Sequence, residues 1–158
     1  GLEPRLDARL CELDFGEGDG LTPAEMRERF PEARAAFEAD PAGHPLPGGE
    51  DPYKAAARFT LALDDVRAAH PGGRVLVVAH TTVIRLALCR LLGVPLGSYR
   101  RLFPHIGNCA LTELRLRGEE VAVLQFNTPV GAAGGALPGQ PLSAPAIRPR
   151  MKKRPSTT

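Results

Sequence analysis

The sequence predicts an α/β domain built on a mostly parallel sheet, and two observations carry this prediction. The run VLVVA at residues 75–79 is apolar and largely β-branched, and it stops abruptly at His80. Such a run is typical of a strand buried on both faces, as the strands of parallel sheets are. Helical patterns lie directly before and after it, as expected for alternating strands and helices.

The other elements follow from local signals along the chain. The tetrapeptide TPAE at residues 22–25 is a capping box with proline at the first helical position, and Asp51-Pro52 is a second helix start. Gly93 stands where a third helix should end. The patterns predict helices over residues 22–39, 51–70 and 81–92, and a hairpin with strands at residues 109–116 and 121–126.

His80 is the first candidate site residue. Ligands of open α/β sheets bind where the carboxyl ends of strands meet the amino ends of helices. His80 occupies such a position, beside backbone N–H groups and a helix dipole that favour an anion. The alternative is a histidine that merely ends a strand.

Glu12 is the second candidate. It lies in residues 9–22 (RLCELDFGEGDGLT), where glycines interrupt regular structure among several acids. A carboxylate held in such a loop is a candidate general acid, although a solvated acidic loop explains the same pattern. The polar cluster GGED at residues 48–51 is explained nearly as well by helix capping.

Composition and charge restrict the classes of function. No apolar run approaches the ~20 residues of a membrane-spanning helix. The chain has 20 basic and 18 acidic residues, but no acid follows Glu120, so the positive charge belongs to a tail and not to a nucleic-acid-binding face. We expect a domain over residues 1–128 and a disordered, Gly/Pro-rich basic tail over residues 129–158.

The three cysteines are widely spaced and lack metal-ligand spacing. They are interpreted as small core residues of a protein from a reducing, cytoplasmic compartment. Neither a metal nor another cofactor is expected.

Four segments in series resemble the motifs of the histidine phosphatase superfamily, also called phosphoglycerate mutase-like. Residues 9–22 resemble RLxExxFGxWEGxT, with glycine for tryptophan at position 18 and aspartate for glutamate at position 19. Residues 49–51 resemble GES, residues 77–85 (VVAHTTVIR) resemble VVSHGGVIR, and residues 108–112 resemble NxxxT. The resemblance covers about residues 5–127.

The resemblance implies a three-layer α/β/α fold and a phosphomonoester hydrolase that acts through a phosphohistidine intermediate. His80 would contact the transferring phosphoryl group and Glu12 would protonate the leaving oxygen. Thr81 would bind the substrate phosphate at the helix start, while Arg85 is interpreted as a solvated or salt-bridged residue. The implied partner is a small phosphomonoester, with neither nucleic acid nor membrane involved; self-association is left open.

The nucleophile is the main departure from the family pattern. The family carries it in an Arg-His-Gly motif on its first strand, and no such triplet exists in this sequence. None of His44, His70 and His105 follows a buried strand. We therefore expect the nucleophile, and with it an amino-terminal βα portion, upstream of Gly1.

Two alternatives remain open. A non-catalytic phosphate-binding or interaction module that has lost its nucleophile fits the same residues, and so does a phosphoglycerate mutase-type phosphotransferase. Hydrolysis is favoured over transfer because the loop between Ala39 and Asp51 is too compact for a large lid. The sequence does not identify the substrate.

Overall fold

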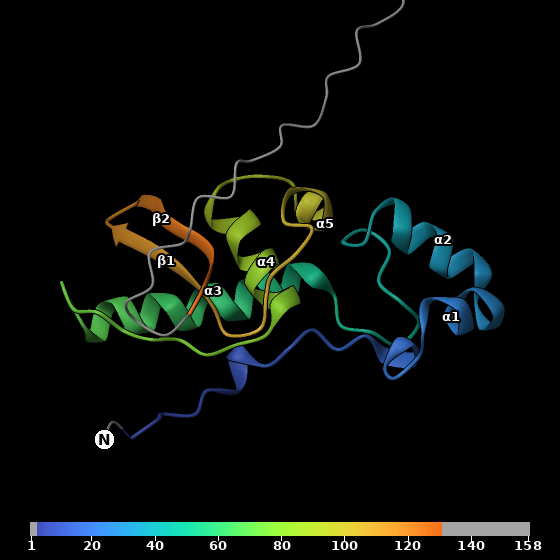
Figure 1. The fold of residues 1–158 in the computed structure, drawn as a ribbon, viewed down its shortest axis with the longest axis horizontal. Helices are drawn as coiled ribbons and strands as arrows, with labels where there is room; N and C mark the ends of the chain where they lie inside the picture. The colour runs from blue at the N-terminus through green and yellow to red at the C-terminus, as the bar shows by residue number, and fades with distance from the viewer. Residues whose placement is uncertain (1–2, 131–158) are drawn as a thin grey trace, which may run out of the picture.

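A computed structural model describes residues 3–130 of the chain. The long helix α3 (Pro52–Ala69) forms its base, and α4 (Thr81–Leu91) packs against α3 (Figure 1). The short helices α1 (Pro23–Arg29) and α2 (Pro31–Ala39) form a pair at one end of the molecule. The predicted tail over residues 129–158 lies outside the described residues except for its first two positions.

The helix starts follow the local signals. Thr22 accepts a hydrogen bond from the amide of Glu25, whose carboxylate accepts the amide of Thr22 in return, so the predicted capping box is confirmed. Asp51 caps α3 by accepting from the amide of Tyr53. The single helix predicted over residues 22–39 is wrong, because Pro31 provides no N–H and moves Phe30 out of helical geometry, so that a second helix begins there.

The hairpin prediction is confirmed. Strands β1 (Ala110–Arg117) and β2 (Glu120–Pro129) pair antiparallel around a turn with Gly118 at a φ of 55°, and the register shifts on either side of Glu113. This hairpin is the one sheet found within residues 3–130. The described chain is therefore α/β, but the mostly parallel, three-layer sheet that we expected is not formed by these residues.

The segment Val75–Ala79 corrects the prediction of a strand buried on both faces. It runs past α3 without a strand partner among the described residues. Leu76 and Val78 are 76% and 81% exposed, whereas Val77 and Ala79 pack against the apolar side chains of α3 and α4. The alternation is that of a strand covered on one face only, and its backbone groups lack the neighbour that a ladder requires.

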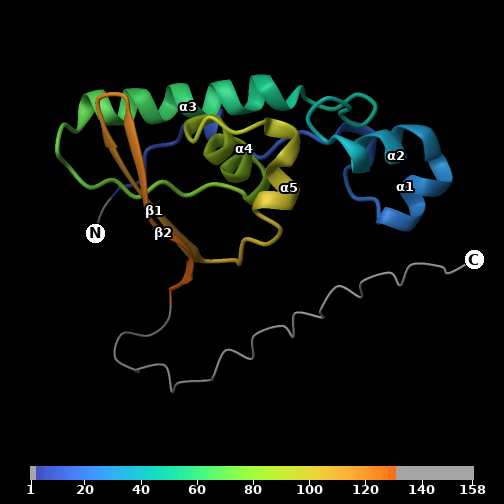
Figure 2. The same cartoon turned by 90° about the horizontal axis from the view of Figure 1, so that it is seen from above.

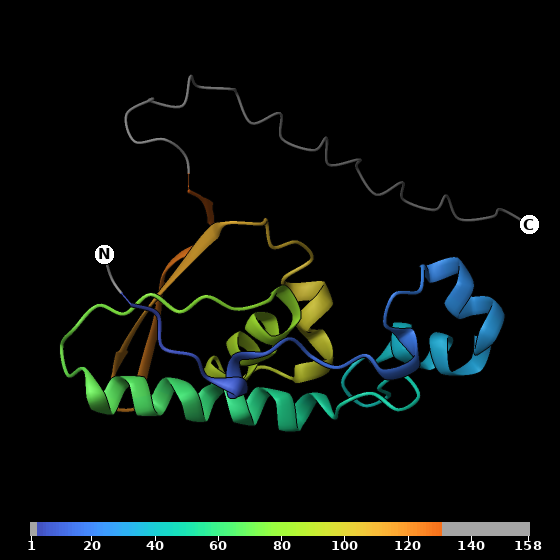
Figure 3. The ribbon, with the colours of Figure 1, turned by 90° about the horizontal axis from the view of Figure 1, so that it is seen from below.

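The amino-terminal segment lies along α3. Figures 2 and 3 show its short 3₁₀ turn η1 (Ala8–Leu10) against this helix, after which the chain passes the start of α4 and turns through η2 (Gly16–Gly18) toward α1. This path brings Glu12, near the beginning of the acidic loop, to the start of α4.

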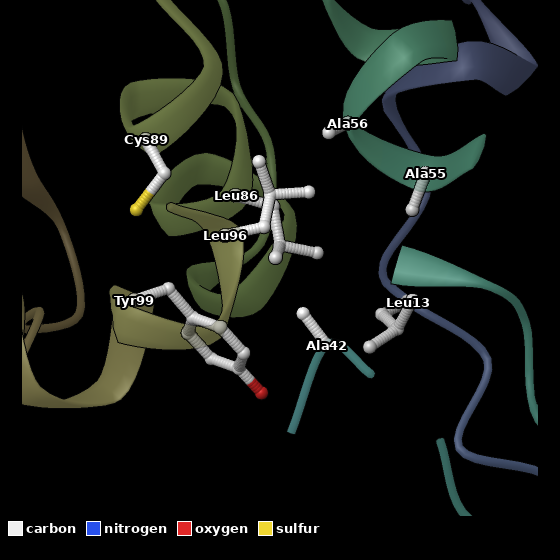
Figure 4. Close-up of a cluster of buried hydrophobic side chains, with 8 residues drawn as sticks. All are labelled: Leu13, Ala42, Ala55, Ala56, Leu86, Cys89, Leu96 and Tyr99. Atoms are coloured by element: carbon white, nitrogen blue, oxygen red, sulfur yellow. The ribbon is translucent and has the colours of Figure 1, made fainter. Parts of the chain in front are cut away.

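A compact core fixes this path (Figure 4). The small side chains of Ala55 and Ala56 on α3 leave room for Leu86 of α4, and Leu13 inserts into the same cluster from the acidic loop. Cys89 of α4 belongs to the cluster on the side toward Tyr99. Ala42, Leu96 of η3 (Leu96–Ser98) and Tyr99 of α5 (Tyr99–Leu102) complete it. Burial of Leu13 anchors the residue next to Glu12.

The cysteines only partly match their predicted role as core residues. Cys89 is buried, and burial raises the pKa of its thiol to about 11. Cys11 and Cys109 are exposed. Within residues 3–130, no helix is long and apolar enough to cross a membrane.

Candidate active site

Glu12 meets the amino end of α4 although 70 residues separate the two in sequence. Its carboxylate oxygens accept hydrogen bonds from the amides of Thr82 at 3.0 Å and Val83 at 2.9 Å. One of these oxygens also accepts the amide of Leu13 at 2.9 Å. The carboxylate therefore satisfies two of the amides that a helix start leaves without partners, and its negative charge lies at the positive end of the helix dipole.

The first turn of α4 lacks a cap of its own, which explains why this contact matters. His80 occupies the N-cap position and its side chain makes no capping hydrogen bond. Glu12 supplies the missing acceptor from a distant part of the sequence.

Arg58 of α3 holds the backbone that carries Glu12. Its guanidinium pairs with both carboxylate oxygens of Glu50 at 2.8 Å. It also donates to the carbonyl oxygens of Arg9, Cys11 and Glu12 at 2.7, 2.8 and 3.1 Å. All five N–H donors of an arginine are used in this way, so Arg58 ties residues 9–12 to α3 and to the loop before it.

The electrostatics of the ion pair between Arg58 and Glu50 strengthen this attachment of residues 9–12 to α3. The hydrogen bonds from Arg58 hold the pKa of Glu50 below its ordinary value of 4.5. The same bonds raise the pKa of Arg58. Both side chains are about one fifth exposed, so the pair is shielded from much of the solvent that weakens surface ion pairs.

Glycine allows the acidic loop to approach the loop before α3 closely. Gly16 has a φ of 56°, and a side chain there would collide with the backbone of Pro47, Gly48 and Gly49. The amide of Glu17 donates to Pro47 O, and the amide of Glu50 donates to Asp14 O, each at 2.9 Å. The first and second motif segments thus form one unit that carries Glu12.

The predicted site residues His80, Thr81 and Glu12 are brought together at one helix end. His80 is exposed and Thr81 is half-buried at the first position of α4. Neither the amide nor the hydroxyl of Thr81 donates a hydrogen bond to any of residues 3–130, so both are free to bind a ligand there. The amides of Thr82 and Val83, by contrast, already have Glu12 as their acceptor.

The interpretation of Arg85 as solvated or salt-bridged is wrong. The residue is half-buried, and its Nε is fully enclosed with no hydrogen-bond partner in the described part of the chain. Burial, and next the nearby charge of Arg100, lower the pKa of Arg85. The helix pattern of residues 81–92 could not reveal the lowered pKa of Arg85, because the charge of Arg100 that contributes to it comes from another helix, α5.

Arg58 was also missed by the sequence analysis. Its position eight residues after Glu50 offered a weak signal, but the three carbonyl groups that it binds are about 50 positions away. His44, His70 and His105 are all exposed. None of them makes a side-chain hydrogen bond to another described residue.

The fourth motif segment has a structural role. Thr112 Oγ1 accepts the amide of Asn127 at 3.2 Å, and Asn127 Oδ1 accepts the amide of Gly107 at 2.8 Å. Asn127 adopts a left-handed φ of 53°, which asparagine tolerates better than most residues. These bonds fasten the end of the hairpin to the loop that leads into it.

Known proteins resemble this chain in both sequence and fold. It is 33% identical over 98 residues to phosphoserine phosphatase 1 of Hydrogenobacter thermophilus, covering 62% of this chain and 46% of that protein. It is 34% identical over 122 residues to a glucosyl-3-phosphoglycerate phosphatase of Mycobacterium tuberculosis, covering 72% and 54%. A mycobacterial glucosyl-3-phosphoglycerate phosphatase solved with inorganic phosphate superposes with a TM-score of 0.68 at 29% identity, covering 79% and 65%.

The model of the histidine phosphatase superfamily (branch 1) matches residues 1–129, and the chain belongs to this family. The chain spans about half the length of the two curated relatives and 65% of the solved chain. Its relatives include phosphatases of small phosphate esters.

Proposed function

We propose that this chain forms part of a phosphomonoester hydrolase that acts through a phosphohistidine intermediate, with the nucleophilic histidine supplied by sequence upstream of Gly1. The observation that carries the proposal is the meeting of Glu12 and the His80 end of α4, fixed by two hydrogen bonds of 3.0 and 2.9 Å. Membership of the histidine phosphatase superfamily supports it.

Each site residue has a role in this proposal. His80 donates a hydrogen bond to the transferring phosphoryl group, and the free amide and hydroxyl of Thr81 bind its oxygens at the helix start. Glu12 protonates the leaving oxygen and then helps to activate water. For this step Glu12 turns away from the amides of Thr82 and Val83, because an oxygen that accepts two N–H groups has no proton to give.

The proposal includes the finer architecture. The unpaired backbone edge of Val75–Ala79 pairs with a further strand. This strand completes the mostly parallel sheet of the three-layer fold and brings the nucleophile near His80. The enzyme works in the cytoplasm without a metal ion or another cofactor. Residues 1–128 form its catalytic domain portion, and residues 129–158 form a separate basic tail.

A second candidate function is a non-catalytic phosphate-binding module, and the absence of an Arg-His-Gly triplet from the sequence favours it. A phosphotransferase of the mutase type uses the same residues and is the third candidate. Hydrolysis is preferred over transfer because the segment between α2 and α3 is short and contains no further helix or strand.

Phosphate release from a generic aryl phosphate, with and without a chelator, tests the proposal. The 158-residue chain should show no turnover, whereas the product of the longer reading frame should turn over equally well with the chelator present. In that product, His80→Ala should slow phosphoryl transfer by roughly 10²–10³. Glu12→Gln should lose most with poor leaving groups, since only these need protonation.

The candidates give different results in this assay. Turnover of the short chain that is abolished by changing His44 or His105 would contradict the upstream nucleophile. A longer product that binds phosphate without turnover would support the non-catalytic module. Equal losses across the leaving-group series for Glu12→Gln would show that Glu12 is structural.

A further inference from the structure

Arg85 carries a charge that the described structure leaves uncompensated. Its Nε is enclosed by protein without a hydrogen-bond partner, and no carboxylate within residues 3–130 pairs with its guanidinium. Removing a charged group from water is costly unless an opposite charge or hydrogen-bond acceptors replace the solvent. The neighbourhood of Arg85 therefore favours an anion.

The charged group that α5 brings to the neighbourhood of Arg85 is a second cation, Arg100, and not an anion. Its guanidinium lies over the ring of Phe37, 5.0 Å from the centroid, and over that of Tyr99 at 5.6 Å. Its Nε donates to the Tyr99 hydroxyl at 3.1 Å. These contacts orient the guanidinium without neutralising it, because no carboxylate of the described residues pairs with Arg100.

Arg34 and Arg58, which are also partly buried, do not share the state of Arg85. Arg34 donates to Glu38 at 2.9 Å, and Arg58 donates to Glu50 at 2.8 Å. Like Arg100, Arg34 stacks on Phe37, so stacking on this ring does not exclude pairing with an acid. The enclosed Nε without a partner thus distinguishes Arg85 from these two residues, and the exposed Arg100 is a second cation whose charge acts on it.

The location of the pair links it to the candidate active site. Arg85 lies one helical turn after Thr81 on α4, which places the two residues on the same side of the helix. The charge of Glu12 acts on Arg85 as well, together with Tyr99 and Arg100. Arg85 is therefore next to the position proposed for the substrate phosphate, and the charge of Arg100 acts on it there.

We propose that Arg85 and Arg100 bind a second anionic group of the substrate, a carboxylate or a further phosphate, next to the phosphoryl group that is cleaved. Arginine suits this task because its planar fork of N–H donors matches the geometry of carboxylates and phosphates. The inference rests on the proposed function and narrows its substrate class to phosphomonoesters with an anionic group close to the ester.

Paired ligands test this inference on the 158-residue chain. Phosphoglycolate and ethyl phosphate both present a phosphate ester on two carbons, but a carboxylate of the first replaces a methyl group of the second. Titrations followed through the amide NMR signals of the chain give both affinities, even where binding is weak. Phosphoglycolate should bind about tenfold more tightly, as expected for a charge-assisted hydrogen bond.

Variants locate the effect. Arg100→Met should reduce the affinity ratio of the two ligands to about one, and Arg100→Lys should retain part of it. Arg101→Met is the matched control, because the neighbouring Arg101 is exposed and donates to Ser98 Oγ instead of stacking on Phe37. This control should leave the ratio at the wild-type value. The amide spectra show at the same time that each variant is folded.

Three results would overturn the inference. Equal affinities in the wild-type chain, with ethyl phosphate bound, would remove the second anion site and leave the proposed function intact. An unchanged ratio in Arg100→Met would remove Arg100 from the site. Binding of neither ligand would contradict the phosphate site of the proposed function, and the inference would fail with it.

Discussion

The Glu12 carboxylate accepts the amide of Val83 at 2.9 Å, although 71 positions separate the two residues. The bond joins the loop of the first motif segment to the helix that begins after His80. The two sequence patterns, taken separately, do not predict this contact.

Removing the Glu12 carboxylate should destabilise the chain. Glu12→Ala leaves the first turn of α4 without an acceptor, and the loss of a helix cap costs about 1–2 kcal/mol of the free energy of unfolding. Urea denaturation measures this difference. Glu17→Ala serves as the control, since Glu17 is exposed and its side chain makes no hydrogen bond to the described residues; a similar loss there would contradict the capping role.

Arg58→Lys should loosen the loop that carries Glu12. Lysine keeps the positive charge opposite Glu50 but cannot reach three carbonyl groups and a carboxylate at once, so we expect a loss of about 2–3 kcal/mol in the free energy of unfolding. Arg67→Lys is the comparison, because Arg67 is more exposed and binds a single carbonyl, that of Gly118. Equal effects of the two substitutions would contradict the role of Arg58 in holding the loop that carries Glu12.

The Glu50–Arg58 pair should make stability depend on acid pH. The folded-state pKa of Glu50 lies below 4.5, so the pair contributes its full stabilisation above the unfolded-state pKa and loses it as the pH falls through the lower folded-state value. Wild type should therefore exceed Glu50→Gln in stability at about pH 7, and this difference should shrink toward about pH 3.5. Urea unfolding of both proteins across this range measures it, and a constant difference would contradict the assignment.

The backbone amides of Val75–Ala79 should exchange rapidly with solvent in the monomeric chain. The segment has no strand partner among residues 3–130, and amides without such partners are poorly protected. Hydrogen exchange read by mass spectrometry tests this, with the amides of β1 as the protected reference. Strong protection in a demonstrably monomeric chain would show that the sheet closes without a further strand. That result would favour the non-catalytic phosphate-binding module over the proposed enzyme.

The elements that the sequence predicted correctly are those with local determinants. The capping box at Thr22, the Asp51 cap and the turn at Gly118 each depend on residues a few positions apart. The break between α1 and α2 at Pro31 also has a local cause. It was missed because the sequence on both sides of the proline favours a helix. Sequence patterns therefore defined most element bounds to within a few residues.

The tertiary features could not be predicted in this way. Val75–Ala79 has the composition of a central strand, but no strand pairs with it among residues 3–130. The hydrogen bonds of Arg58 depend on carbonyl groups that are distant in sequence, and the pKa of Arg85 depends on its burial and on the charge of Arg100. The resemblance to the family motifs indicated that Glu12 and His80 belong together. The burial of Leu13 in the same cluster as Leu86 of α4 explains how they meet.

The most direct test of the central claim is to locate inorganic phosphate on the chain. We expect that titration with phosphate shifts the backbone amide signals of Thr81, Thr82 and Val83 in a saturable manner, because phosphate binds at the start of α4 and displaces Glu12 there. His80→Ala should weaken this response. Saturation with the largest shifts far from α4, or no response at these amides, would contradict the assignment of Glu12 and His80 to a phosphate site.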